Sequence, residues 1–412
     1  MQSKYFLIGL IAVSAACTSK KIDYASMPDD KLMRVADSLA QAYILVDGHV
    51  DLPYRLRVSH FRLEKEYLGI PIRSEEGDFD YERAKKGGLD APFMSIYIPT
   101  EQQQPGVAKA LADSLMDMVD GIVREHPDKF APAGTPDDII ANTKAGKLSL
   151  PFGMENGAPI ENDLKNVQYF YDRGVRYITL SHSKNNQICD SSGDTTQVWG
   201  GLSPFGIEVV KEMNRVGIMV DISHVHDSTF YQVMNLTKVP CIASHSSCRA
   251  FAPTVKRDMT DDMIKKMGEN GGVIMINFYN AFLDSVVVNQ NDKNRKKLEA
   301  LLAEKKLTMD DSLARPIISQ FEKDNPSLKT DVKIVANHID HIVKIAGIDH
   351  VGIGSDYDGV DGDLPTGLED VSKYPNLIFE LLKRGYTPDD IEKICSKNVF
   401  RVWNKVIEAS KQ

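Results

Sequence analysis

Short apolar runs alternate with amphipathic stretches along the chain from residue 41 onward, which is the pattern of a parallel sheet wound with helices. Most of the runs are apolar without alternation, as expected of strands that are buried on both faces. The predicted strands are Tyr43–Gly48, Ala91–Ile98, Ser149–Met154, Val175–Ser181, Gly217–Ser223, Val239–Ser244, Gly272–Phe278 and Asp349–Ser355. Eight such units close a (β/α)8 barrel of the TIM type, so the sequence predicts this α/β fold.

Two local patterns refine this prediction. Ser203 can cap a helix that has Pro204 at its first position, and Gly217 ends this helix before the next strand. Between about residues 280 and 330, a Lys-rich helical stretch at 294–306 and a second amphipathic piece interrupt the alternation. The sequence therefore predicts an inserted helical segment after the seventh strand, on the barrel rim where loops carry specificity.

The start of the chain has the features of a signal peptide. Lys4 precedes an apolar run at 5–13 that is too short to span a bilayer, and small residues lead up to Cys17. This arrangement resembles a bacterial lipoprotein processing site, in which Cys17 becomes the acylated first residue of the mature chain. Ser14 stands where an aliphatic residue is usual, so ordinary secretory cleavage remains the alternative.

This interpretation divides the chain into a signal peptide at 1–16, a polar tether at 17–40 and a barrel domain at 41–412. No later segment is apolar enough to span a membrane. We expect an exported protein whose only membrane contact is a lipid anchor, held at a bacterial cell membrane and facing the periplasm or the exterior.

Composition and charge exclude one class of partner. The 412 residues contain 49 Lys and Arg against 58 Asp and Glu, a net charge of −9, so the basic surface that nucleic-acid binding needs is missing. Besides Cys17 there are four cysteines, which allow three disulfide pairings in an exported protein. We expect these thiols to be buried and free, since Cys241 and Cys395 lie in apolar runs.

Histidine and carboxylate side chains follow the predicted strands. His49 and Asp51 are two residues apart at the end of the first strand, so their side chains point the same way. Further candidates follow the third, fourth, fifth, sixth and eighth strands: Glu155, His182, His224, His245 and Asp356. Because parallel strands end at the same mouth of a barrel, these side chains are predicted to lie together.

Three imidazoles and two carboxylates exceed what one tetrahedral zinc ion needs. Two ions fit better, with His49 and Asp51 on one, His224 and His245 on the other, and Glu155 and a water or hydroxide bridging them. Histidine and carboxylate without cysteine suit zinc, although manganese or iron accepts the same set.

Two nearby residues are alternatives to the proposed site residues, and the remaining histidines are given no role in the site. His226 is the alternative to His224 in the same turn, and Asp358 faces the same way as Asp356. The pair His338 and His341, one helical turn apart, is interpreted as a solvated or capped helix face. His60, His126 and His350 lie in loops or at strand starts and are given no role.

Seven motifs, in order over about residues 41 to 410, resemble the membrane dipeptidase (renal dipeptidase) family of the metal-dependent amidohydrolase superfamily. They are Asp47-Gly48-His49-Val50-Asp51, Gly153-Met154-Glu155-Asn156-Gly157, Leu180-Ser181-His182-Ser183, Gly201-Leu202-Ser203-Pro204-Phe205-Gly206, Asp221-Ile222-Ser223-His224, Ser244-His245-Ser246-Ser247 and Gly352-Ile353-Gly354-Ser355-Asp356-Tyr357-Asp358-Gly359. The resemblance implies a binuclear zinc barrel that cleaves dipeptides and tolerates a D-residue at the carboxyl-terminal position. The insertion near 280–330 departs from the shorter mammalian form of the family.

The resemblance also implies residue roles. The same five residues are the metal ligands, His182 and Arg257 bind substrate, and Asp356 is the acid/base. Arg249 competes with Arg257, because the alignment past Ser247 needs about one residue of slack. Family members are commonly dimers, so a homodimer is expected.

The expected reaction is hydrolysis of an unblocked dipeptide by a metal-bridging hydroxide. Asp356 takes the proton from the attacking water and delivers it to the leaving amine, unless it is only a further metal ligand. Two other functions stay open on sequence alone. One is a different amide or ester hydrolase of the same superfamily, such as an acyl-amino-acid deacylase or lactonase, and the other is a non-catalytic solute-binding lipoprotein.

Overall fold

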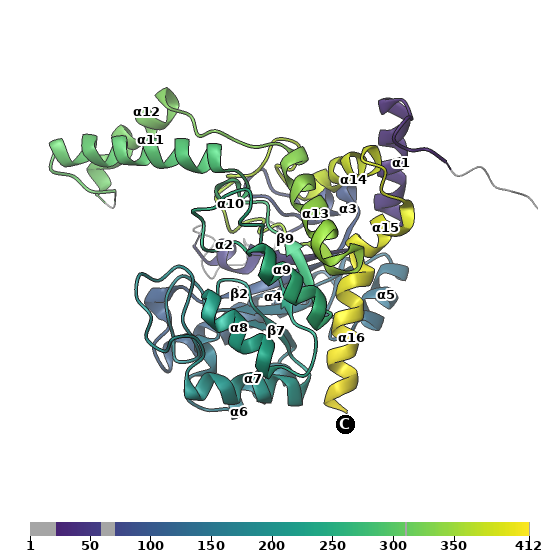
Figure 1. Cartoon of the computed structure of the whole chain (residues 1–412), viewed down its shortest axis with the longest axis horizontal. Coiled ribbons are helices and arrows are strands. Elements are labelled where there is room, and N and C mark those ends of the chain that lie inside the picture. Colours follow the sequence, from purple (N-terminus) through teal and green to yellow (C-terminus); the bar gives the residue numbers. More distant parts are fainter. Residues whose placement is uncertain (1–21, 59–70, 310, 412) are drawn as a thin grey trace, which may run out of the picture.

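The computed structural model describes residues 22–58, 71–309 and 311–411. In this part of the chain eight parallel strands close a barrel in the order β1-β10-β9-β8-β7-β6-β5-β2 (Figure 1). The barrel strands are β1 (Leu45–Val50), β2 (Leu89–Tyr97), β5 (Phe152–Glu155), β6 (Val175–Thr179), β7 (Met219–Asp221), β8 (Ile242–Ala243), β9 (Val273–Ile276) and β10 (Val351–Ile353). The predicted (β/α)8 barrel is confirmed, and every predicted strand boundary lies within three residues of an observed one.

Helices connect successive strands and cover the outside of the barrel (Figure 1). They are α1 (Asp29–Ala42), α2 (Leu52–Val58), α3 (Tyr81–Gly87), α4 (Val107–Glu125), α5 (Pro136–Lys144), α6 (Lys165–Asp172), α7 (Pro204–Val216), α8 (Asp227–Leu236), α9 (Asp261–Asn270), α10 (Asn280–Leu283), α11 (Ser285–Glu304), α12 (Arg315–Asp324), α13 (Val332–Ala346), α14 (Tyr374–Lys383), α15 (Pro388–Glu392) and α16 (Asn398–Ser410). A short second sheet pairs β3 (Phe130–Ala131) with β4 (Leu148–Ser149). Strands of two residues carry no periodic signal, which is why the sequence did not predict them.

Two local predictions are confirmed. The Ser203 side chain caps α7 by accepting a hydrogen bond from the Gly206 N–H at 2.8 Å, and Gly217 ends the helix in the left-handed region at φ 93°. The cysteines of the described residues are buried and free, as expected: Cys189, Cys241, Cys248 and Cys395.

The predicted tether is wrong from residue 29 onward. Residues 29–42 form α1, which packs against α14 through Leu32, Ala36 and Ala40, all fully buried. These residues are four apart, so they share one helix face. The helix therefore belongs to the folded domain.

The N-terminal predictions fall largely outside the structure. The signal peptide at 1–16 and the acylation site Cys17 lie outside the described residues and stay predictions. Within the described ranges, none of the helices combines the length and the apolar character needed to cross a bilayer.

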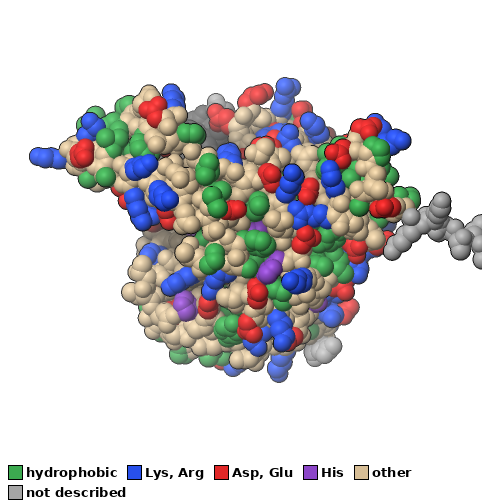
Figure 2. Space-filling model, turned by 45° about the horizontal axis from the view of Figure 1, so that its top comes forward, with side chains coloured by type: hydrophobic (Ala, Val, Ile, Leu, Met, Phe, Trp, Pro, Cys, Tyr) green, Lys and Arg blue, Asp and Glu red, His purple; other side chains and the backbone are tan. Residues whose placement is uncertain are grey.

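The predicted insertion after the seventh strand consists of α10, α11 and α12, and the last two project away from the barrel (Figure 1). Lys and Arg side chains gather along this arm in Figure 2. Helix α11 begins at Ser285 rather than at Asn294, because the Asp284 carboxylate caps it by accepting from the Val286 N–H at 2.6 Å. Leu298, Leu302 and Ala314 form a small separate core in the arm.

The barrel interior is filled with side chains and is closed at one end by α16. Trp403 of α16 lies under Phe93 with a ring separation of 5.3 Å, and Phe93 lies at the same distance from Tyr177. A Cβ atom on Gly153 would come within 1.9 Å of the Tyr177 ring, so glycine makes room for this tyrosine. The Tyr177 side chain reaches the other end of the barrel, where the strands have their carboxyl ends.

Candidate functional site

The predicted ligands and Asp356 meet at the carboxyl-terminal mouth of the barrel. His49 is in β1 and Asp51 directly follows it, whereas Glu155 is the last residue of β5. The remaining candidates follow β6, β7, β8 and β10 by two or three residues: His182, His224, His245 and Asp356. All of these residues therefore lie at the same end of the barrel, as the sequence predicts.

Glu155 lies at the centre of the group and is 4% exposed. Its Oε2 is 3.3 Å from Nε2 of His49, whereas its Oε1 is 3.1 Å from Nε2 of His224 and 3.3 Å from Nε2 of His245. Burial acts to raise the Glu155 pKa, but the surrounding imidazoles bring this pKa well below its ordinary value. Each carboxylate oxygen thus faces a different set of imidazoles, which is the arrangement a shared metal ligand requires.

His49 is oriented by Tyr177. The Tyr177 hydroxyl donates to the Gly48 carbonyl at 2.9 Å and lies 2.9 Å from Nδ1 of His49. Because the hydroxyl donates its only proton to the Gly48 carbonyl, the hydroxyl oxygen accepts a hydrogen bond from Nδ1 of the imidazole. The other ring nitrogen, Nε2, is therefore the one that points toward Glu155 and toward Asp51, whose Oδ2 is 3.3 Å away.

His245 is oriented by a similar series of hydrogen bonds. Its Nδ1 lies 2.7 Å from the Ser244 hydroxyl, and this hydroxyl donates its own proton to Oδ2 of Asp221 at 2.6 Å. Nε2 of His245 is left with a lone pair, 2.9 Å from Nε2 of His224. Burial lowers the pKa of both His224 and His245 well below the ordinary value, so both rings stay neutral.

Two buried aspartates fix the backbone beside these residues. Oδ1 of Asp47 accepts from the N–H of His49 and of Ser355, both at 2.9 Å. Oδ1 of Asp221 accepts from the N–H of Ser223 at 3.1 Å and of Ser244 at 2.8 Å. Each aspartate therefore ties together the ends of two strands that carry candidate ligands.

The donor set fits divalent metal ions. Three groups each have their candidate ligand atoms within 4.8 Å of one another: His49 with Glu155 and His245, His182 with Glu155 and His224, and His49 with Asp51 and Asp356. Buried Nε2 of His49 and Oδ1 of Asp51 have no hydrogen-bond partner. Nitrogen and carboxylate oxygen atoms that converge in a buried site and lack hydrogen-bond partners are satisfied by a cation.

Asp356 lies beside this group on the loop after β10. Its backbone N–H donates to the His49 carbonyl at 3.1 Å, and its Oδ2 accepts from the Asn277 amide at 2.8 Å. Burial, together with the charges of Asp51 and Glu155, raises its pKa to about 7. Its backbone is in the left-handed region at φ 67°, which is strained for an aspartate. The position suits both an acid/base and a further metal ligand.

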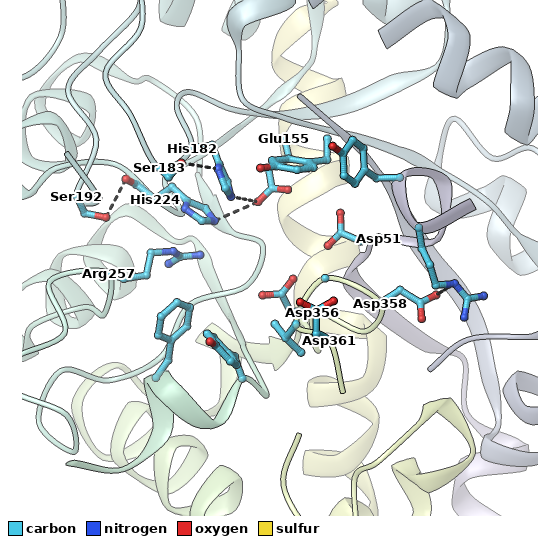
Figure 3. A pocket seen from close by; sticks show the side chains of 18 residues that line it. Asp51, Glu155, His182, Ser183, Ser192, His224, Arg257, Asp356, Asp358 and Asp361 are labelled. Carbon is cyan, nitrogen blue, oxygen red and sulfur yellow. Dashed lines mark hydrogen bonds and ion pairs between the residues drawn. The ribbon is translucent and has the colours of Figure 1, made fainter. Parts of the chain in front are cut away.

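A cavity of about 590 Å³ opens onto the group and is also lined by Arg257. Figure 3 shows Arg257 on the same side as His182 and His224, across from Asp51 and Asp358. The Nη1 and Nη2 atoms of Arg257 donate to the Ser246 hydroxyl and to the His245 carbonyl, whereas its buried Nε has no partner. The cavity is therefore positive at one end and acidic at the other.

The competing residues are engaged by other partners. Arg249 is engaged by Asp227 through two hydrogen bonds of 2.7 and 2.8 Å and does not line the cavity. His226 caps α8 through the Ser228 N–H, so His224 rather than His226 reaches Glu155. Asp358 lines the cavity, but its Oδ1 accepts from the Asp78 N–H and its Oδ2 lies 3.2 Å from Nε of Arg55. The structure thus brings Arg257 and His224 to the site.

Sequence reasoning missed the residues that support and enclose the ligands. Tyr54 and Tyr97 line the cavity, and the Tyr97 ring lies 4.7 Å from the His182 ring; Tyr279 and Phe282 also line it, and Phe282 lies next to Arg257. These aromatic residues are indistinguishable from core residues in sequence. A signal did exist for Asp47 and Asp221, because a carboxylate inside an otherwise apolar strand needs a special partner.

Comparisons with known proteins agree with this geometry. A family model described as membrane dipeptidase (peptidase family M19) matches residues 33–412. The probable dipeptidase PvdM from Pseudomonas aeruginosa is 27% identical, with a TM-score of 0.78 over 92% of this chain and 99% of that chain. A metallopeptidase from Rhodobacter sphaeroides, solved with a phosphinate mimic of the dipeptide L-Ala-D-Ala, is 24% identical, with a TM-score of 0.71 over 88% of this chain and 99% of that one. The latter likeness is one of fold.

Replacing Tyr177 by Phe tests the orientation of His49. Loss of the hydroxyl leaves Nδ1 of His49 without its acceptor, so we expect affinity for a divalent metal to fall about 10- to 100-fold. Affinity is measured by competition with a chromophoric chelator. Tyr386→Phe, which removes a hydroxyl bound to Asp340 far from the site, is the matched control. Equal affinity in Tyr177→Phe and the wild type would show that the hydroxyl does not orient this ligand.

Proposed function

Because the chain belongs to the membrane dipeptidase family, peptidase family M19, we propose that it is a zinc-dependent dipeptidase that hydrolyses unblocked dipeptides and tolerates a D-residue at the carboxyl-terminal position. The observation that carries the proposal is the position of Glu155, whose two oxygens face different imidazoles in a buried mouth. The unpartnered atoms of His49 and Asp51 beside it support a metal centre.

In the proposed centre, His49 and Asp51 hold one ion, His224 and His245 hold the other, and Glu155 is shared. When bound, two zinc ions supply a hydroxide nucleophile near neutral pH and polarise the carbonyl of the substrate. The nitrogen and oxygen donors suit zinc, and no thiol lies in the three ligand groups found among the described residues.

Asp356 is proposed to move the proton. It lies in the wall of the cavity next to His49 and Asp51, and the Asn277 amide holds one of its oxygens. From there the carboxyl group takes the proton of the attacking water and delivers it to the amine that leaves. The left-handed backbone of Asp356 keeps the carboxyl group turned toward the ligand group.

The charges of the cavity are proposed to orient the substrate. Arg257 receives the terminal carboxylate through its planar guanidinium, whose Nε has no other partner. His182, whose Nε2 is 3.7 Å from Oε1 of Glu155, lies close enough to the centre to contact the carbonyl oxygen of the scissile bond. The amino group of the dipeptide then extends toward the acidic side that Asp51 and Asp358 line.

Metal removal and dipeptide hydrolysis test the function directly. The purified protein is expected to hydrolyse L-Ala-D-Ala and related dipeptides, to lose this activity with a chelator and to regain it with zinc. Amino-acid release is followed by a ninhydrin assay, with N-acetylated amino acids and lactones as competing substrates. Turnover of acylated amino acids or lactones without dipeptides, or full turnover in metal-free protein, would contradict the proposal.

Replacing Asp356 by Asn separates its two possible roles. We expect Asp356→Asn to keep both metal ions while kcat falls about 10²- to 10⁴-fold, because the amide cannot transfer the proton. Metal content is measured by elemental analysis alongside kcat. Asp358→Asn changes the other carboxylate of this loop, which lies on the proposed amino-group side, and is expected to lower kcat far less. Loss of one metal ion in Asp356→Asn favours the ligand role instead.

We also propose, from the sequence of residues 1–17, that the protein is exported and anchored by lipid at Cys17. Cys17→Ala is expected to abolish incorporation of labelled palmitate and to release the protein from the membrane fraction. Because residue 17 precedes the part of the chain that matches the family, residues 33–412, dipeptidase activity should be unchanged. Unaltered membrane association of Cys17→Ala would favour ordinary secretory cleavage and another mode of attachment.

A further inference from the structure

The side chain of His338 on α13 is fully buried and lies outside the ligand groups described above. Its Nδ1 accepts a hydrogen bond from the Cys248 N–H at 3.0 Å, and its Nε2 faces the Leu283 carbonyl at 3.0 Å. Because a backbone N–H only donates and a carbonyl only accepts, the ring is the neutral tautomer with its proton on Nε2. Burial lowers its pKa to about 4, which keeps this tautomer at neutral pH.

This observation corrects the interpretation of His338 as part of a solvated or capped helix face. Only its neighbour fits that description: His341 is partly exposed and lies 2.7 Å from Asp261. His338 instead joins two segments that are far apart in sequence. One is the connection from β8 to α9, which contains Cys248, and the other is α10, which ends at Leu283.

The first of these segments carries Arg257. Nη1 of Arg257 donates to Ser246, two residues before Cys248, at 2.8 Å. On the other side, Met259 lies two residues after Arg257 and pairs with Cys248 in a parallel bridge, with the Met259 N–H donating to the Ser247 carbonyl at 2.9 Å. The side chain of Arg257 is thus attached through Ser246, and its backbone is attached through Met259. Both attachments lie next to Cys248, the residue to which His338 is hydrogen-bonded.

The second segment carries the aromatic wall opposite Arg257. Phe282 precedes Leu283, and its ring lies 5.6 Å from the Arg257 guanidinium. The two segments also meet directly, since the Ser285 N–H donates to the Phe251 carbonyl at 3.0 Å and the Phe251 ring lies 4.5 Å from the His338 ring. His338 is thus the one side chain that bonds both walls of the carboxylate end in this part of the described structure.

We infer that His338 is a positioning residue for substrate selection: its two hydrogen bonds set the spacing between Arg257 and the Phe282 wall, and thereby the fit of the terminal carboxylate. The inference rests on the proposed function, in which Arg257 receives that carboxylate. His338 touches neither the substrate nor the metal ligands, so its removal acts on substrate binding rather than on the chemical step. Without it, the Cys248 N–H and the Leu283 carbonyl are left buried and unpaired, and the two segments move apart.

The test compares His338→Leu, which fills the space without bonding, with His338→Gln, whose amide offers one donor and one acceptor. We expect KM for L-Ala-D-Ala to rise about 10- to 100-fold in His338→Leu, with kcat within about 3-fold of the wild type, and most of the KM loss to be recovered in His338→Gln. The inhibition constant of the dipeptide amide, which presents no carboxylate to Arg257, is expected to change less than 3-fold. Arg257→Lys should show the same selective pattern.

His341→Ala, one turn along the same helix, is the matched control and should leave KM unchanged. If His338→Leu fails to fold, His338→Asn replaces it, because the shorter amide cannot reach both backbone groups. Equal changes for dipeptide and amide, or a loss of kcat with KM unchanged, would show that His338 has only a structural role and would overturn the inference. Absence of dipeptide hydrolysis in the wild type would instead reject the proposed function, so the two failures are distinguishable.

Discussion

The structure depends on holding several buried titratable groups close together. At the barrel mouth, the Nε2 atoms of His49, His224 and His245 converge on Glu155, with Asp51 beside them. Burying charge costs several kcal/mol per ion, so this arrangement persists only because the surrounding structure holds these groups in place. Asp47 and Asp221 supply much of that constraint, since each accepts two backbone N–H groups from neighbouring strand ends. The mouth is thereby preorganised for cations.

Packing inside the barrel also helps to hold the site residues in place. Trp403, Phe93 and Tyr177 form a continuous aromatic column from α16 to the mouth, and the Tyr177 hydroxyl ends that column against His49. Core packing is dense, so a ring locked between neighbours cannot turn its hydroxyl away. The absence of a side chain at Gly153 is what gives the Tyr177 ring its place. Packing far from the site therefore fixes the ring orientation of a residue that is predicted to bind metal.

The sequence predicted the parts of this protein that repeat and missed the parts that do not. Eight strands and the residues that end them were recognisable, because apolar runs and polar residues at strand ends are local patterns. Helix α1 was missed because Leu32, Ala36 and Ala40 form a narrow apolar face in a segment that is otherwise polar. Tyr177 was missed for a different reason: a buried tyrosine looks like core until its hydroxyl is seen to meet an imidazole 128 residues away in sequence. Contacts over such separations depend on barrel closure, which no local pattern encodes.

In this fold, the residues proposed to bind metal and those proposed to select the substrate lie on different kinds of element. The candidate ligands lie in or within three residues of barrel strands, where the register of the sheet determines their positions. Arg257 and Phe282, in contrast, are on a long connection and on the first helix of the inserted segment, which the sheet does not constrain. A binding wall at the root of a projecting arm needs an attachment to the barrel that does not pass through the arm. His338 supplies one, because it bonds the wall to α13, the helix that returns toward the last strand, without involving α11 or α12.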